Sequence, residues 1–464
     1  MGRSWPSFVH PECAYGLERN EDGELVETGQ KELQFSDDNL VKNLDVFSEE
    51  SIQNYTNALK ERVLACWTCQ GCDFHLNATQ EDGNVTAFHF LEFSGTKQLV
   101  EDMNRFRKAI GADKLSLYGI SYGTQVMSTF ATIFPDLVDK FIVDSNTAPT
   151  SNLFESAWEF AEGINQRIDY LIYSCSARNA LEPGACPVDD MRVCINDFNQ
   201  LASQSTTAII LSNFIKALYE FSGQAKDLCD LAASGNLNDL EVFFDELYPA
   251  AVDNATESIM MRSEEDDIIL LSSGPTLEEF VYGNPEYTNI TSINYGGAVG
   301  ALVLAQDWWG NVCYNDEFFI KQTMEVNTMY TGAGTGHPAN SFALWYGFGF
   351  YWPKGTPLPP RGNPYQTGIV SGQLFDTATP YTMTQKMRAS FPSTRLLTSQ
   401  SISHGLRSAI DTAGEPSCQI HIVKYLETGV VGFDDGTFCG SPFATNIDLQ
   451  FTFGAFWCVP KTTY

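Results

Sequence analysis

The chain has 464 residues, of which 43% are hydrophobic and 13% aromatic, so it can build a large core and is not a disordered chain. Its formal net charge of −31 argues against nucleic acid as a partner, because a phosphate backbone binds basic surfaces. No apolar run approaches the ~20 residues of a transmembrane helix. Met1 is not followed by the apolar segment of a signal peptide.

Twelve cysteines and five N-glycosylation sequons together indicate an oxidising, secretory compartment. The sequons lie at Asn54, Asn77, Asn84, Asn254 and Asn289. Cys66, Cys69 and Cys72 have a spacing that could suggest a metal or redox site, with His75 as the only nearby fourth ligand. In a sequon-rich chain we expect disulfides instead. We therefore predict a secreted or endolysosomal glycoprotein without a metal site.

Residues 1–85 are polar and irregular, apart from a helix predicted over residues 51–64. An amphipathic helix is predicted over residues 96–110, because apolar residues recur there at helical spacing until Gly111.

A Gly-x-Ser-x-Gly motif, GISYG, occupies residues 119–123. It lies between a short apolar run at residues 115–118 and a helical pattern that ends at Pro135. The motif thus falls on a strand-to-helix turn, which is the position of a nucleophile elbow. Such a turn holds Ser121 in a strained conformation with its hydroxyl exposed.

The neighbours of Ser121 fit this chemistry. Gly119 and Gly123 have no side chains, so we expect both to let the strand and the helix approach the turn closely. The helix that starts after Ser121 directs its N-terminal amides and dipole to the same place. We therefore expect the amide of Tyr122 to donate to an oxyanion.

Residues 141–143 predict the next strand and close a strand–helix–strand unit, which implies parallel pairing. Residues 151–340 look mostly helical, and we interpret them as a helical cap inserted over a catalytic core. The alternative is an independent helical domain without a role at the site. The predicted helices lie at residues 154–175, 191–203, 208–221, 236–247, 298–308 and 316–324.

After the cap, a strand predicted at residues 368–376 ends in Asp376, and a second strand at residues 394–398 precedes a loop with His404. A helix follows Pro380, and the final helix spans residues 418–427. Loops at the carboxyl ends of parallel strands meet at one edge of a sheet. Asp376 and His404 are therefore expected to lie near Ser121, in the chain order of α/β-hydrolase triads.

The three side chains have complementary roles. Ser121 is too weak a nucleophile alone and needs a base. His404 would take its proton and later give it to the leaving group. Asp376 would orient the imidazole and stabilise its charged form.

Other residues compete for two of these roles. Asp144 ends the strand after the motif and is the alternative acid. His337, in a glycine-rich loop, is the second candidate for the base. His421 lies within the last predicted helix, which favours a core or surface position.

These pieces resemble the tripeptidyl aminopeptidase-like branch of the α/β-hydrolase serine peptidases, which also holds the prolyl aminopeptidases. The resemblance covers residues 85–150 and 340–440. The matching segments are GISYGT at 119–124, FPDLVDKFIVD at 134–144, GQLFDTATP at 372–380, SHG at 403–405, Cys418, YLxxG at 425–429 and GTxC at 436–439.

The resemblance implies an α/β-hydrolase fold with a mostly parallel sheet. Residues 1–150 would form the first part of the core, residues 151–340 the helical cap, and residues 341–464 the rest of the core with a TAP-like C-terminal module. It also implies a disulfide between Cys418 and Cys439.

The implied function is that of a serine hydrolase that cleaves near the N-terminus of peptides through an acyl-enzyme, as a tripeptidyl or prolyl aminopeptidase. The family uses no metal or organic cofactor. The alternatives are a carboxylesterase that acts on small esters and a truncated, non-catalytic remnant. Only the aminopeptidase needs carboxylates that hold a free α-ammonium group. Candidates in the cap are Glu155, Glu159, Glu162, Glu264 and Glu265.

The chain departs from the family before the motif. Family members have several strands there and a Gly-Gly-Pro-Gly-type loop that supplies the second oxyanion donor, whereas the only Gly-Gly pair here is Gly296-Gly297. Gly-Arg-Ser-Trp-Pro at residues 2–6, followed by Cys13, resembles the segment just after the fourth core strand. We therefore expect the N-terminal strands to be missing, one edge of the sheet to be unpaired, and the chain by itself to have weak activity.

Overall fold

The computed structural model describes residues 17–19, 25–27, 48–68, 75–79, 85–89, 95–181, 188, 190–202, 225–236, 239, 242–243, 307, 316–329, 358, 360–400, 404–406 and 418–439. The helix expected at residues 208–221 lies outside this part of the chain, as do most of the helices expected at residues 236–247 and 298–308.

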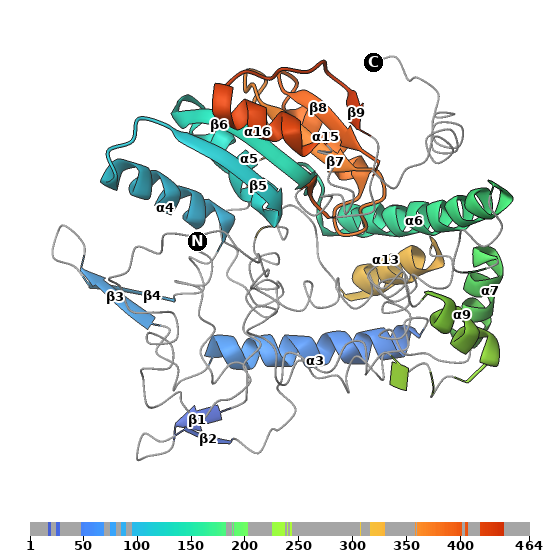
Figure 1. Ribbon diagram of the computed structural model, residues 1–464. Helices are drawn as coiled ribbons and strands as arrows, with labels where there is room; N and C mark the ends of the chain where they lie inside the picture. The colour runs from blue at the N-terminus through green and yellow to red at the C-terminus, as the bar shows by residue number, and fades with distance from the viewer. Residues whose placement is uncertain are drawn as a thin grey trace.

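A parallel sheet of five strands lies at the top of Figure 1. Its order is β5 (Leu115–Ser121), β6 (Val138–Asn146), β7 (Ile369–Gln373), β8 (Arg395–Ser399) and β9 (Thr437–Cys439). Every neighbouring pair is parallel, which confirms the predicted sheet of an α/β-hydrolase. Within the described residues, β5 is an outer strand of this sheet.

Helices cover both faces of the sheet because its strands are apolar on both sides. Phe141 and Val143 of β6 pack on one face with α5 (Tyr122–Ile133) and α15 (Tyr381–Ser390). Ile142, between them, packs on the other face with α16 (Gln419–Thr428). The alternation of side chains along a strand thus divides the core into two layers.

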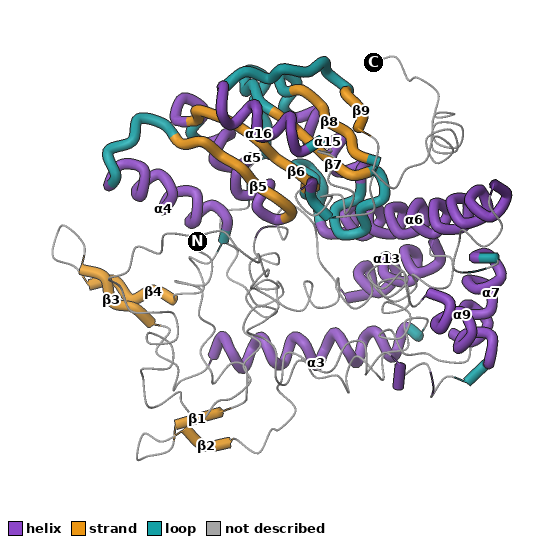
Figure 2. The backbone as a smooth tube through the Cα atoms, in the orientation of Figure 1, coloured by secondary structure: helices purple, strands orange, loops and turns teal. Residues whose placement is uncertain are grey.

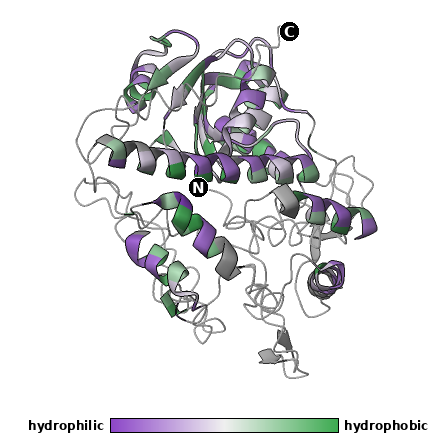
Figure 3. Cartoon of the chain, turned by 90° about the vertical axis from the view of Figure 1, so that its right-hand side faces the viewer, coloured by the Kyte–Doolittle hydropathy of each residue, from purple (hydrophilic) through white to green (hydrophobic). Residues whose placement is uncertain are grey.

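Further helices confirm several predictions, and Figure 2 shows α3, α6, α7 and α13 below the sheet in that view. Their bounds are α3 (Glu49–Thr68), α4 (Thr96–Ala109), α6 (Leu153–Leu181), α7 (Met191–Ala202) and α13 (Asp316–Met329). Figure 3 shows hydrophilic and hydrophobic residues mixed along the helices, as expected for helices with one face on a core. The helix α9 (Ala225–Ser234) was not predicted.

The prediction that residues 1–85 are irregular outside the helix is wrong in two places. Strand β1 (Leu17–Arg19) pairs with β2 (Leu25–Glu27), and β3 (His75–Thr79) pairs with β4 (Val85–His89), both antiparallel. The second hairpin has a sequence signal, because polar and apolar residues alternate in β3 and an Asp-Gly pair, typical of hairpin turns, follows in the sequence.

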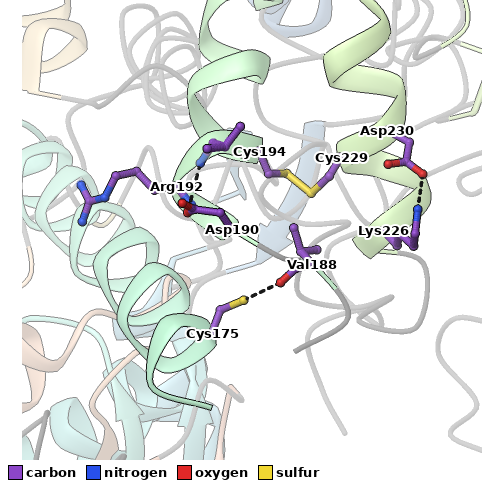
Figure 4. Close-up of a disulfide and its surroundings, with 9 residues drawn as sticks. Cys175, Val188, Asp190, Arg192, Cys194, Lys226, Cys229 and Asp230 are labelled. Carbon is purple, nitrogen blue, oxygen red and sulfur yellow. Dashed lines mark hydrogen bonds and ion pairs between the residues drawn. A yellow bond between two sulfur atoms is a disulfide. The ribbon is translucent and has the colours of Figure 1, made fainter. Parts of the chain in front are cut away.

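Between described cysteines, two disulfides tie helices to their neighbours. The expected Cys418–Cys439 bond is present and joins the start of α16 to the end of β9. Cys194 and Cys229 join α7 to α9, as Figure 4 shows. None of the described helices combines the length and the hydropathy needed to cross a membrane.

Candidate active site

Ser121 is the last residue of β5, and α5 begins directly after it. Its backbone has φ 57° and ψ −131°, a conformation that residues with a side chain rarely adopt. Thr124 supports this turn, since its Oγ1 donates to the carbonyl oxygen of Ser121 over 2.6 Å and accepts from the amide of Thr147 over 3.0 Å. Strain of this kind is concentrated at functional sites.

Of the two glycines in the motif, only Gly119 is required for a close approach. A Cβ atom at Gly119 would lie 2.6 Å from the carbonyl carbon of Gly123 and 2.8 Å from Cγ of Met127. A Cβ atom at Gly123 would meet none of the described residues within 4 Å. The expectation that Gly123 serves the same purpose is therefore wrong, because β5 contacts the backbone of Gly123 and leaves its side-chain position open.

The side chain of Tyr122 is anchored by a buried carboxylate. Its phenol donates to Oδ2 of Asp307 over 2.7 Å. Gln125 donates to the same oxygen over 2.6 Å, and the amide of Thr96 donates to Oδ1 over 2.9 Å. Asp307 thus joins the first turns of α4 and α5 beside the backbone amide of Tyr122. No sequence pattern singles out Asp307, because its partners lie in distant parts of the chain.

Asp376 and His404 are hydrogen-bonded to each other. Asp376 is buried in the loop after β7, and Nδ1 of His404 donates to its Oδ2 over 2.8 Å. The amides of Ala378 and Thr379 donate to Oδ1 over 2.8 and 3.1 Å, and Oγ1 of Thr379 donates to Oδ2 over 2.8 Å. Because Nδ1 carries the hydrogen in this bond, Nε2 is the nitrogen that can accept a proton.

The loop of His404 lies against the residue before Ser121. A Cβ atom at Gly405 would be 3.1 Å from Cγ2 of Ile120. Ser121, Asp376 and His404 all follow or end strands at the carboxyl edge of the sheet, as the sequence predicts. Within the described part of the chain, Ser121 and His404 are not joined by a hydrogen bond. Such bonds are often long in enzymes without substrate.

The pKa of His404 lies above its ordinary value. Burial lowers this pKa, but the hydrogen bond that His404 donates to Asp376 and the charges of Asp376 and Asp144 raise it by more. A carboxylate beside the ring favours the imidazolium form. His404 is therefore suited to hold a proton taken from a hydroxyl.

The competing candidates have other contacts. Asp144 is buried, and its carboxylate accepts from the amide of Leu406 over 2.7 Å and from the side chain of Ser371 over 2.9 Å. His421 lies in α16 with its ring centroid 4.9 Å from that of Phe433. His337 lies outside the described residues.

Helix α6 packs directly on the loop that holds Asp376. A Cβ atom at Gly163 would lie 2.5 Å from Cγ of Pro380. Arg167 donates to the carbonyl oxygen of Phe375 over 3.3 Å, and the rings of Tyr170 and Phe375 stack at 4.0 Å. The first helix of the expected cap is thus part of the support of the site.

The described carboxylates at the start of α6 already have partners. Glu159 is buried, pairs with Lys386 at 2.5 Å and accepts from Ser151. Glu155 accepts from the amide of Asn152 at the helix start, and Glu162 accepts from Gln166. Glu264 and Glu265 lie outside the described residues. Among the described residues, no cluster of His, Cys, Asp or Glu has the composition of a metal site.

Two stretches of the chain match known protein families. Residues 67–170 match the family described as alpha/beta hydrolase fold, and residues 350–439 match the family described as TAP-like protein. These matches contain Ser121, Asp376 and His404, and they agree with the parallel sheet. The chain therefore has an α/β-hydrolase core.

The chain is also similar to curated peptidases. It is 30% identical over 105 residues to serine protease Hip1 of Mycobacterium tuberculosis, which covers 23% of this chain and 20% of that protein. The same protease of Mycobacterium bovis gives the same values.

A second relative is the tripeptidyl aminopeptidase of Streptomyces lividans, which is 38% identical over 55 residues. This similarity covers 12% of the chain and 10% of that relative. The chain thus spans a fifth or less of the length of these curated relatives. Together the family matches and the relatives support a serine hydrolase.

Proposed function

We propose that this α/β-hydrolase core performs acyl transfer from Ser121 and that the protein is a serine peptidase. In this proposal the hydroxyl of Ser121 attacks the substrate carbonyl, and Nε2 of His404 takes its proton. Asp376 keeps the imidazole in the required tautomer and stabilises its charged form. The backbone amide of Tyr122 donates to the oxyanion that develops.

The second half of the reaction follows from the same groups. His404 gives its proton to the leaving amine, which departs and leaves an acyl-enzyme on Ser121. Water then loses a proton to His404 and attacks the acyl carbon. Collapse of this intermediate returns the proton to Ser121 and releases the N-terminal piece, since the shortened peptide has already left as the amine.

The observation that carries the proposal is the hydrogen bond between His404 and Asp376, at the sheet edge where β5 ends in Ser121. A fully buried carboxylate that accepts the Nδ1 hydrogen of a half-buried histidine is what a general base needs. The strained backbone of Ser121, next to the loop of His404, supports the same assignment.

For the substrate, we propose peptides with an unblocked N-terminus, from which the enzyme removes a short N-terminal piece. The TAP-like match over residues 350–439 supports this proposal, as does the similarity to a tripeptidyl aminopeptidase. We also propose that residues 151–340 form a cap between two parts of the core, residues 1–150 and 341–464.

The disulfides support a further part of the proposal, namely an oxidising compartment, either secreted or endolysosomal. Asn54, one of the sequon asparagines, is exposed on α3 and is accessible to a glycan.

The peptide specificity is tested with chromogenic tripeptide amides that have either a free or an acetylated N-terminus. We expect release of the chromophore from the free form and little from the acetylated form, with no release by Ser121→Ala. Equal turnover of both forms would overturn the aminopeptidase assignment. Turnover of small esters without any peptide cleavage would instead indicate a carboxylesterase.

A further inference from the structure

The two residues that follow His404 are held by two neighbouring residues at the end of β6. The amide of Gly405 donates to Oγ of Ser145 over 2.8 Å, and the amide of Leu406 donates to Oδ2 of Asp144 over 2.7 Å. Two consecutive amides of the loop are thus bound by two consecutive side chains. None of these contacts includes the imidazole ring itself.

Backbone conformation explains how both side chains reach the same loop. Neighbouring residues of a regular strand point to opposite faces of the sheet. Ser145 leaves this pattern because its φ is 53°, in the left-handed region. Gly405 also has a left-handed φ, 88°, on the opposite side of the contact. Both deviations serve a contact between β6 and the loop of His404.

The hydrogen bonds continue into β7 and form a closed network. Ser145 donates its hydroxyl hydrogen to Oε1 of Gln373, while Nε2 of Gln373 donates to Oδ1 of Asp144 over 3.1 Å. Ser371 donates to the same Oδ1 over 2.9 Å. We call these four fully buried side chains, Asp144, Ser145, Ser371 and Gln373, the histidine-loop clamp.

The donors around Asp144 favour its ionised form. Its two oxygens accept three hydrogen bonds and have no acceptor nearby in the network, which is the pattern of an ionised carboxylate. The pKa of Asp144 is raised by burial and by the charge of Asp376, and the hydrogen bonds from Leu406, Gln373 and Ser371 oppose this rise in part. Buried polar networks of this kind are stable only when every member is satisfied.

Asp144 also acts on His404 through its charge. Burial lowers the pKa of His404, and two carboxylates raise it: Asp376 through a hydrogen bond and its charge, and Asp144 through its charge alone. These are the charged groups that act on the ring within the described part of the chain.

We propose that the histidine-loop clamp sets the position of His404 and that Asp144 is a second, non-contacting carboxylate for this base. Asp144 and Ser145 are positioning residues, since they act through the backbone of the loop and through charge. The proposal rests on the proposed function of His404 as the general base. The alternative is a buried network that stabilises the core and has no effect on His404.

Two variants separate the two actions of the clamp. Asp144→Asn keeps the shape but removes the charge and turns an amide hydrogen toward a donor. Ser145→Gly removes the hydroxymethyl group and adds no backbone strain, because glycine adopts a φ of 53° readily. The matched control is Asp139→Asn, which removes a carboxylate at the other end of β6, where the side chain is 54% exposed.

Two measurements are made on each folded variant. The first is the pH titration of His404 by histidine NMR, with the signal assigned by His404→Gln. The second is the rate constant for labelling of Ser121 by a fluorophosphonate between pH 5 and 9. Circular dichroism and thermal melting show whether a variant is folded.

We expect Asp144→Asn to lower the pKa of His404, so that the labelling rate rises with pH at a lower midpoint. We also expect it to reduce the plateau, which is the labelling rate at high pH. We expect Ser145→Gly to reduce the plateau on the order of tenfold at an unchanged midpoint. Asp139→Asn should match the wild type. If Asp144→Asn does not fold, the test rests on Ser145→Gly. A plateau labelling rate in Ser145→Gly equal to that of the wild type would then overturn the proposal.

The proposal would also be overturned if the pKa of His404 in Asp144→Asn, and the labelling rates of both variants, equalled those of the wild type. Failure of the proposed function is a different result, in which wild-type Ser121 itself is not labelled. In that case the NMR titration still decides, since an unchanged pKa of His404 in Asp144→Asn would contradict the role of Asp144.

Discussion

Ser121 has a backbone conformation that its neighbours must hold in place. Thr124 binds the carbonyl oxygen of Ser121, and the strand before it lies against the backbone of Gly123. The second contact depends on the missing side chain of Gly119. The two glycines of the motif therefore have different roles, although they are equivalent in the sequence pattern.

This difference predicts unequal effects of alanine. We expect Gly119→Ala to destabilise the protein by about 1–3 kcal/mol and to abolish labelling of Ser121, because the new methyl group would overlap backbone atoms. Gly123→Ala should leave both nearly unchanged, since none of the residues that the structure describes lies within 4 Å of its Cβ position. Thermal melting and fluorophosphonate labelling measure the two effects. Equal loss in both variants would contradict the assigned contact.

Single residues also show what a sequence can and cannot predict. Ser121, Asp376 and His404 each follow a recognisable strand, so their common edge could be inferred. The partners Ser145 and Gln373 are 228 residues apart, and no periodic pattern reports that they meet. One indirect signal exists, because polar residues at 371 and 373 interrupt a strand whose five residues are all buried.

At the scale of elements, α6 acts as a brace for the loop of Asp376. Gly163, Arg167 and Tyr170 lie on one side of this helix and contact Pro380 or Phe375. The spacing of three and four residues places them on one face. The position of Asp376 therefore depends on a helix that belongs to the expected cap.

A test of this brace is Gly163→Ala. In an exposed helix this change stabilises by roughly 1 kcal/mol. Here the methyl group would lie 2.5 Å from Cγ of Pro380, so overlap outweighs helix propensity. We expect a lower melting temperature and turnover reduced on the order of tenfold or more. Gln166→Ala, on the same helix, is the control, and a stabilised, fully active Gly163→Ala would refute the brace.

Element length decides which parts of the fold the sequence revealed. The helices α3, α4, α6, α7 and α13 have enough turns to show their period. Strand β9 has three residues, too few to show any period, and it forms only because β8 offers an edge. The hairpin of β3 and β4 could have been found from its alternation and turn.

At the scale of the whole molecule, buried polar contacts join segments that lie far apart in the sequence. Asp307 binds the first turns of α4 and α5. Arg361, at the return of the chain to the core, donates to Ser128 over 3.2 Å and to Thr147 over 3.1 Å. Burial lowers the pKa of Arg361 to about 9. The geometry of the sheet edge therefore depends on residues from distant parts of the chain.

The most direct test of the central claim is the site and rate of fluorophosphonate labelling, followed by peptide mass spectrometry. We expect modification at Ser121, with a rate that falls on the order of a thousandfold or more in His404→Gln. The wild-type rate should rise with pH through a midpoint above the ordinary histidine pKa of 6.5, because only neutral His404 accepts the proton and nearby carboxylates raise its pKa. Labelling at another residue, or an unchanged rate in His404→Gln, would contradict the claim that His404 activates Ser121.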